Sequence, residues 1–242
     1  MVLTHTTNHT YNHPFPTVTL AFFLRYCTPQ LNPFANHVLS TDTIAQHVDP
    51  ATGRLHTTRI HLKKSKMPPA VMKLLPTSLT GGAADKASYI LETSVVDMKE
   101  GWMSTESRNL NFVGVLSVIE KQTYSAPATS PSQHVTAPNP FASNGTTDVA
   151  TTVIFRSRLG ERIRDKLHTA HHDASGEGGW FSRLGARGVQ RSIESLASTK
   201  TVDQLGKSRE GMQKILERLR QTGVMGVLEL RKMARERSME AA

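Results

Sequence analysis

Apolar and polar residues alternate in many short stretches of the first 160 residues. Alternation with a period of two places every second side chain on one face of a strand, which is typical of a sheet with one buried face. Six stretches show it, at residues 37–48, 54–64, 87–99, 102–112, 114–124 and 149–159, and TTNHTY (6–11) is a candidate seventh. Turn sequences such as DPATG (49–53) and MKEG (98–101) separate neighbouring stretches. The pattern therefore predicts a mostly antiparallel, meander-like sheet.

Helical spacing of apolar residues replaces alternation in three places. Residues 15–26 are predicted to form a short helix, and residues about 182–221 a long one. The tail, residues 222–242, indicates a further basic amphipathic helix. The predicted fold class is α+β, in which the long helix packs on the sheet and residues 1–221 form one domain.

Arg25 interrupts the apolar flank of the first predicted helix. It falls on the same side of the helix as Val18 and Phe22, which should face a core. A buried guanidinium is costly unless an anion meets it. Two explanations are open: an internal carboxylate pairs with Arg25, or a ligand brings the anion.

The long helix carries two stripes. Leu205, Met212 and Leu216, with Thr201 and Leu219, form an apolar stripe that should lie on the sheet. The second stripe begins apolar at Ile193 and becomes polar and cationic at Lys200, Gln204 and Lys207. A helix that runs along a cavity with an anion at one end would show this pattern. The alternative is that both lysines extend to solvent beside the packed face.

A third feature follows the second predicted strand. Lys63, Lys64 and Lys66 precede an apolar loop at residues 67–76, which should not be left in water. The loop is predicted to be a lid over an apolar pocket or a membrane-touching segment; the alternative is a loop that packs on its own domain. Its candidate contact residues are Met67, Pro68, Val71, Met72, Leu74 and Leu75.

The charge balance is basic, with 29 Lys and Arg against 20 Asp and Glu and a pI of about 9.9. Nucleic acid, an acidic membrane surface and a phosphate-bearing ligand are all compatible with this excess. Aromatic residues make up only 6% of the chain and are not interleaved with the basic ones, which disfavours nucleic-acid binding. Cys27 is the only cysteine, which excludes an internal disulfide and a cysteine-based zinc site.

An enzyme is the main rival class. HTAHHD supplies His168, His171, His172 and Asp173 at a spacing that a metal could use. The sequence contains no HExxH, GxSxG or Gly-rich phosphate loop that would support this reading. We therefore expect neither a metal nor another cofactor, and no catalysis.

Several motifs resemble the PRELI-like family, the Ups proteins of the mitochondrial intermembrane space. They are AFFLRY (21–26), NPFANHVLSTDTI (32–44), GRLHTTR (53–59), ETSVVD (92–97) and IESLASTK (193–200) followed by GKSREGM (206–212). The resemblance covers residues 1–124 and 149–221 and is closest to the phosphatidic-acid-carrying branch. It implies a PRELI/START-like fold, in which a curved sheet of seven antiparallel strands and its helices enclose a cavity for one phospholipid.

The resemblance also implies a function. Family members carry phosphatidic acid between the mitochondrial outer and inner membranes, which supplies cardiolipin synthesis, and another branch carries phosphatidylserine. They act on anionic membranes as a heterodimer with a small helical protein built on paired cysteines. We expect the same ligand, partner and intermembrane-space location here, with peripheral contact to the inner membrane and no nucleic-acid partner.

The resemblance carries individual residues over. Arg25 corresponds to the family's phosphate-contacting arginine, and Lys200, Gln204 and Lys207 correspond to helix positions at the head-group end. Lys63 matches a strand lysine, and residues 67–76 match the lid loop. Alternation leaves a choice open, since it places Lys64 rather than Lys63 on the strand face of Ile60 and Leu62. The insertion at 125–147 and the tail have no clear family counterpart.

Overall fold

The computed structural model describes residues 2–65, 86–111, 113, 116–127, 145–157 and 181–240, with the side chains of 181–202 and a few others left out. The predicted lid loop at 67–76, most of the insertion at 125–147 and the histidine cluster at 168–173 lie outside the described residues. Within the described part of the chain, no helix combines the length and the apolar character needed to cross a membrane.

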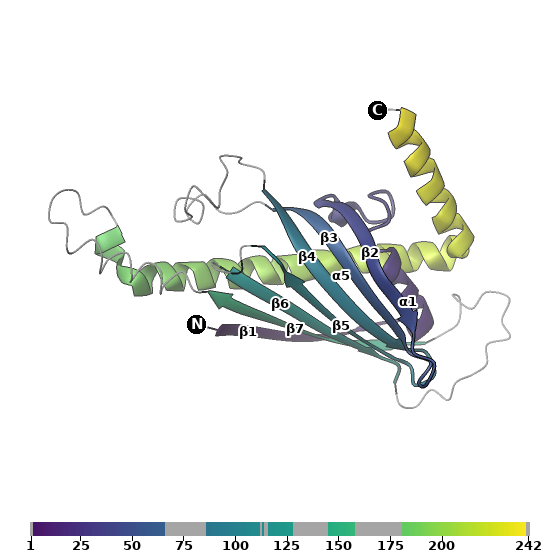
Figure 1. Cartoon of the computed structure of the whole chain (residues 1–242), viewed down its shortest axis with the longest axis horizontal. Helices are drawn as coiled ribbons and strands as arrows, with labels where there is room; N and C mark the ends of the chain where they lie inside the picture. The colour runs from purple at the N-terminus through teal and green to yellow at the C-terminus, as the bar shows by residue number, and fades with distance from the viewer. Residues whose placement is uncertain are drawn as a thin grey trace.

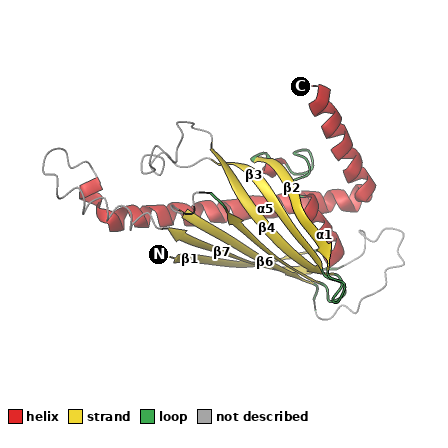
Figure 2. Ribbon diagram, in the orientation of Figure 1, coloured by secondary structure: helices red, strands yellow, loops and turns green. Residues whose placement is uncertain are grey.

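The sheet has seven antiparallel strands, as the alternation and the resemblance predicted (Figures 1 and 2). The strands follow one another across the sheet in the order β1-β7-β6-β5-β4-β3-β2, so β2 to β7 form a meander and β1 adds to β7. Their bounds are β1 (Val2–Tyr11), β2 (Val38–Val48), β3 (Leu55–Ser65), β4 (Lys86–Asp97), β5 (Trp102–Asn109), β6 (Leu116–Ser125) and β7 (Thr147–Ser157).

The helices lie together on one face of the curved sheet (Figure 1). They are α1 (Phe15–Leu24), the 3-10 helix η1 (Pro33–Ala35) and α5 (Phe181–Glu240). α5 contacts α1, η1 and β1 and spans both the predicted long helix and the predicted tail. Gly223 has a φ of 65°, a value that glycine adopts without strain, and the C-terminal end of α5 turns away from the rest of the helix (Figure 1).

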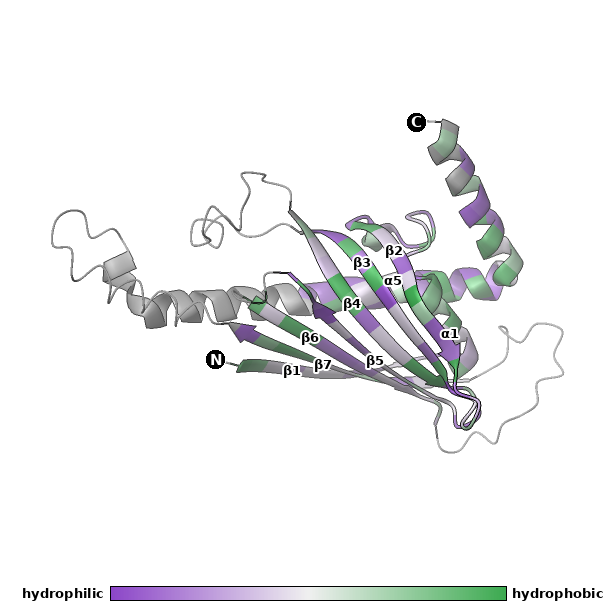
Figure 3. Cartoon of the chain, in the orientation of Figure 1, coloured by the Kyte–Doolittle hydropathy of each residue, from purple (hydrophilic) through white to green (hydrophobic). Residues whose placement is uncertain are grey.

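The core lies between α1, α5 and one end of the sheet. Cross-strand pairing places a row of inner-face side chains from neighbouring strands side by side. Hydrophobic and hydrophilic residues alternate along the strands (Figure 3). The row consists of Leu55, Val96, Met103, Tyr124 and Val149. Val18 and Phe22 of α1 and Ile215, Leu216 and Leu219 of α5 are fully buried in the same cluster. Met212, Leu216 and Leu219 of the predicted apolar stripe therefore face the core, as expected, and the Thr201 side chain lies outside the described residues.

Gly211 allows α5 to approach the segment that follows Arg25. A Cβ at Gly211 would lie 2.5 Å from Oδ1 of Asn32, a buried side chain whose Nδ2 donates a 2.9 Å hydrogen bond to the carbonyl of Arg25. We expect Gly211→Ala to lower the free energy of unfolding by about 1–3 kcal/mol, because the overpacked Asn32 must move. Urea unfolding measures the change.

Gly206 supplies the matched control, since a Cβ there would meet nothing within 4 Å and the residue lies in the same helix. Gly206→Ala should raise stability by about 0.5–1 kcal/mol, the ordinary gain of alanine over glycine in a helix. Equal stability changes in the two variants would show that the approach to Asn32 is not tight.

Candidate functional site

Arg25 directly follows α1 and extends over the inner face of the sheet. Its side chain is only 13% exposed, and its guanidinium carbon lies 3.7 Å from the centroid of the Phe22 ring and 4.8 Å from that of Tyr26. Nη2 donates a hydrogen bond to Oε2 of Glu92 on β4. The structure thus shows the first of the two explanations for Arg25, an internal carboxylate.

Glu92 also meets groups from β3. Its side chain is 2% exposed, and its Oε1 accepts hydrogen bonds from Nε of Arg59, at 2.9 Å, and from Nη2 of the same residue. Nε2 of His61 lies 3.3 Å from Oε2. Arg59 and Glu92 are direct cross-strand partners, so the sheet register itself brings the two charges together.

Electrostatic interactions keep Arg25 and Glu92 ionised. Burial works to raise the pKa of Glu92, but Arg25, the neighbouring imidazole of His61 and Arg59 together hold it well below its ordinary value. Burial works to lower the pKa of Arg25, and Glu92 outweighs it, so that the pKa of this guanidinium lies above its ordinary value. Burial lowers the pKa of His61, which leaves its imidazole neutral at pH 7.

Lys63 joins this group through Tyr26. Its Nζ donates a 3.3 Å hydrogen bond to the Tyr26 hydroxyl and lies 4.9 Å from the ring centroid. Lys63 shares the inner face of β3 with Arg59 and His61, whereas Lys64 is exposed on the opposite face. The inner face of this end of β3 is thus the polar one, so that Lys63 rather than Lys64 lies beside Arg25.

Glu120 on β6 completes the group that we call the cationic cluster: Arg25, Arg59, Lys63, Glu92 and Glu120. Glu120 accepts a 2.9 Å hydrogen bond from Nε2 of Gln122. Burial raises its pKa, although Arg25 and Lys63 oppose this. Three cations therefore face one firmly ionised carboxylate and a second that is easier to protonate. The cluster has an excess of positive charge, which an incoming anion would neutralise.

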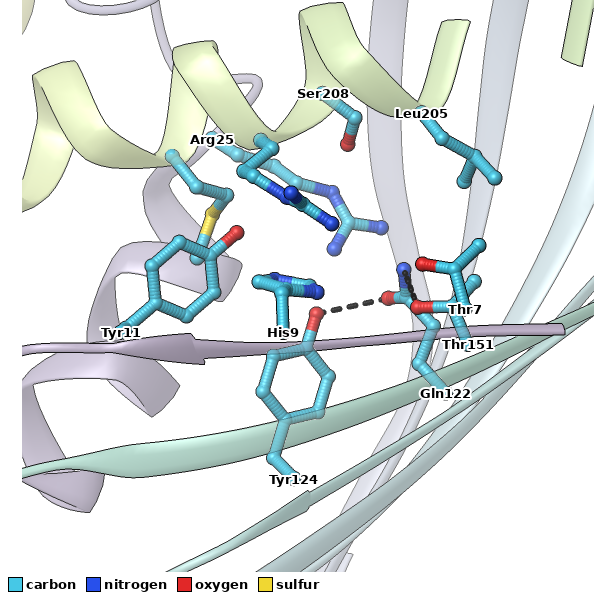
Figure 4. Close-up of a pocket in the computed structure, with 11 residues that line it drawn as sticks. Thr7, His9, Tyr11, Arg25, Gln122, Tyr124, Thr151, Leu205 and Ser208 are labelled. Atoms are coloured by element: carbon cyan, nitrogen blue, oxygen red, sulfur yellow. Dashed lines mark hydrogen bonds between the residues drawn. The ribbon is translucent and has the colours of Figure 1, made fainter. Parts of the chain in front are cut away.

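A small cavity lies beside Arg25, under α5 (Figure 4). Its volume is about 20 Å³, enough for one water molecule at about 10–15 Å³ each but not for a lipid. Nε of Arg25 and both ring nitrogens of His9 are buried here without a hydrogen-bond partner among the described residues. Its other lining residues are Thr7, Tyr11, Gln122, Tyr124, Thr151, Leu205, Ser208, Arg209 and Met212.

Two of the three residues of the long helix that were predicted to bind the head group do not lie in the cationic cluster. The side chains of Gln204 and Lys207 are exposed, and Nζ of Lys207 is 2.7 Å from Oδ2 of Asp203. The Lys200 side chain lies outside the described residues. Leu205, Ser208 and Arg209 are the residues of this turn that line the cavity beside Arg25. The structure thus brings Arg25 and Lys63 together but does not bring Gln204 or Lys207 to them.

His9 makes the stability of the domain sensitive to pH. Burial, and then Arg209, lowers the pKa of His9 to about 4 from 6.5, so the unfolded chain binds a proton there that the folded chain does not. The free energy of unfolding should therefore fall as the pH is lowered from 6.5 to 4. Urea unfolding at pH 7, 5.5 and 4.5 measures this slope.

In His9→Gln the slope should be shallower than in wild type. It should not vanish, because burial also lowers the pKa of His13, His37 and His61. An identical slope in both proteins would show that His9 is not buried as the structure describes.

The described residues hold no group of three or more His, Cys, Asp or Glu side chains that could bind a metal ion. The site is instead an inner-face cluster of ion pairs and aromatic rings beneath two helices. These features define a sheet-and-helix domain with an internal, positively charged recess.

Comparison with known sequences assigns the chain to a family. Residues 16–139 match the model of the PRELI-like family, which is about half of the chain, and the protein therefore belongs to that family.

Individual relatives agree. The chain is 40% identical over 124 residues to "Protein UPS1, mitochondrial" of Saccharomyces cerevisiae, a match that covers 51% of this chain and 64% of that protein. It is 36% identical over 109 residues to "Protein ups1 homolog" of Schizosaccharomyces pombe, covering 45% and 56%. It is 31% identical over 111 residues to "PRELI domain-containing protein 1, mitochondrial" of Gallus gallus, covering 46% and 47%. The matches thus span less than two thirds of each relative.

Among solved structures, the Zhui aromatase/cyclase from Streptomyces sp. R1128 matches with a TM-score of 0.45 and 9% identity, covering 90% of this chain and 96% of that one. A likeness at this level carries no argument about function.

Proposed function

We propose that this chain is a phospholipid-transfer protein that carries phosphatidic acid between the mitochondrial outer and inner membranes and so supports cardiolipin synthesis. The observation that carries the proposal is the cationic cluster, in which Arg25 and Lys63 both contact the ring of Tyr26, at 4.8 and 4.9 Å from its centroid, and positive charge is in excess. No bond needs to be broken in such a role.

The chemistry of the cluster suits a phosphomonoester. Arg25 can offer paired donors to phosphate oxygens, whereas Lys63 acts as a compact point charge. Charge-assisted hydrogen bonds contribute about 1.5–3 kcal/mol each, so two or three would hold a head group firmly and reversibly. A choline head group would place its own cation beside Lys63, which would select against it.

The remaining parts of the proposal come from the family. Lys200 is proposed to contribute to the head-group end of the cavity, and residues 67–76 to form its lid, whereas Gln204 and Lys207 are exposed and are not proposed as ligands. Two of the matched relatives are named as mitochondrial proteins, which supports a mitochondrial location for this chain. We place it in the intermembrane space, peripheral to the inner membrane, in a heterodimer with a small helical twin-cysteine protein.

Phosphatidylserine is the alternative ligand, since another branch of the family is specific for it. Its phosphodiester would satisfy Arg25 equally, but its serine amine would add a cation beside Lys63. This favours phosphatidic acid.

The test is transfer of fluorescent phospholipid between donor and acceptor vesicles, with the full chain in complex with its twin-cysteine partner. We expect fast transfer of phosphatidic acid, slower transfer of phosphatidylserine and none of phosphatidylcholine. Failure of a folded complex to move any of the three lipids would contradict the proposal.

A further inference from the structure

Arg25 is held by an anion that belongs to the protein itself. Oε2 of Glu92 accepts a hydrogen bond from Arg25, while Oε1 accepts two from Arg59. One carboxylate thus connects the proposed head-group arginine, which extends from the helix layer, to an arginine of the sheet. A ligand anion that draws Arg25 away from Glu92 competes with this contact.

The two arginines that contact Glu92, Arg25 and Arg59, are held in place to different degrees. Arg59 and Glu92 are opposite each other on β3 and β4, and Nη1 of Arg59 also donates to the carbonyl of Phe23, at 3.2 Å. Arg25 lies at the end of α1, and its Nε has no hydrogen-bond partner among the described residues. Arg25 is therefore the side chain that a ligand could draw away from Glu92, while Arg59 continues to neutralise the carboxylate.

We propose that Glu92 is a built-in counter-anion that competes with the lipid head group for Arg25 and thereby sets how readily the lipid is released. This rests on the proposed transfer function. A buried arginine without a partner is unfavourable, so Glu92 stabilises the empty carrier. Binding a lipid gives up that contact, which lowers affinity, and releasing the lipid restores it. Glu92 acts here as a positioning residue, through Arg25.

Two variants separate this role from a structural one. In Glu92→Asp the side chain is one methylene shorter. The variant should keep a carboxylate opposite Arg59 and move that carboxylate away from Arg25. Glu92→Gln removes the negative charge and leaves Arg59 unpaired, so it should be less stable. Asp97→Asn is the matched control, because Asp97 lies on the same strand and pairs with Arg54, at 2.9 Å, away from Arg25.

The experiment measures three quantities on each partner-bound protein: the Kd for vesicles containing fluorescent phosphatidic acid, the transfer rate between vesicles, and the Tm. We expect Glu92→Asp to bind the lipid about tenfold more tightly and to release it more slowly. The reason is that the lipid no longer competes with the full charge-assisted hydrogen bond between Glu92 and Arg25. Asp97→Asn should match wild type in binding and transfer. Glu92→Gln, where it folds, should change binding in the same direction as Glu92→Asp.

The outcomes distinguish the counter-anion role of Glu92 from the proposed transfer function. Tighter binding with slower transfer supports the counter-anion role, because a merely structural residue would weaken both together. If wild type binds and transfers phosphatidic acid but Glu92→Asp binds it equally or more weakly, the inference is overturned and the proposed function stands. If folded wild type neither binds nor transfers the lipid, the proposed function fails and the inference falls with it.

Discussion

Arg25→Gln is expected to lower the rate of phosphatidic acid transfer by about 100-fold, because the head group loses the charge-assisted hydrogen bonds that a guanidinium offers. Glutamine keeps much of the length of the side chain and leaves Glu92 paired with Arg59, so the domain should still fold. The measurement is transfer of fluorescent phosphatidic acid between vesicles, with the Tm of each protein determined alongside.

Arg54→Gln is the matched control for this result. Arg54 also pairs with a carboxylate of β4, Asp97, and its guanidinium carbon lies 5.1 Å from the centroid of the Trp102 ring, so it resembles Arg25 in its contacts. It is 40% exposed and lies away from the cationic cluster. Its loss should leave transfer unchanged. Equal losses of transfer in the two variants would show that Arg25 has no special part in binding.

Arg59→Met should have the largest effect on stability. Arg59 is 5% exposed and provides two hydrogen bonds to Glu92, and removing one partner of a buried ion pair costs about 3–5 kcal/mol. Arg25 remains beside Glu92, which places the expected loss at the lower end of that range. Urea unfolding of wild type and variant gives the difference directly.

The double variant Arg59→Met, Glu92→Gln checks the cause. The loss in the double variant should be smaller than the sum of the two single losses, because no buried carboxylate is then left without Arg59, although Arg25 loses its own partner. If the double variant is less stable than Arg59→Met by as much as Glu92→Gln alone loses, the two side chains do not interact and the account of the cluster is wrong.

The sheet could be predicted from the sequence because its strands have one buried face. Six stretches of alternation correspond to β2 to β7 with small differences at their ends. β1 was the weakest prediction, at residues 6–11 against the observed Val2–Tyr11. Its inner face carries polar residues such as His5, Thr7 and His9 as well as Leu3, so alternation of hydrophobicity gives little signal there.

The site was less predictable, because its centre is polar. Arg25 was conspicuous, since it interrupts an apolar helix, but Arg59 and Glu92 lie in strands whose alternation can be assigned to either face. The apolar residues Ile60 and Leu62 suggested that their face of β3 was the inner one, whereas Arg59, His61 and Lys63 are the residues that face inward. The partner of a charge on another strand depends on register, which the sequence of one strand does not contain.

Native mass spectrometry of the full chain with the proposed twin-cysteine partner, after incubation with vesicles of mixed phospholipids, tests the central claim most directly. The account predicts one phosphatidic acid molecule per complex for wild type, and an empty complex for Arg25→Gln. A wild-type complex that carries no phospholipid, or that carries phosphatidylcholine as readily as phosphatidic acid, would contradict it.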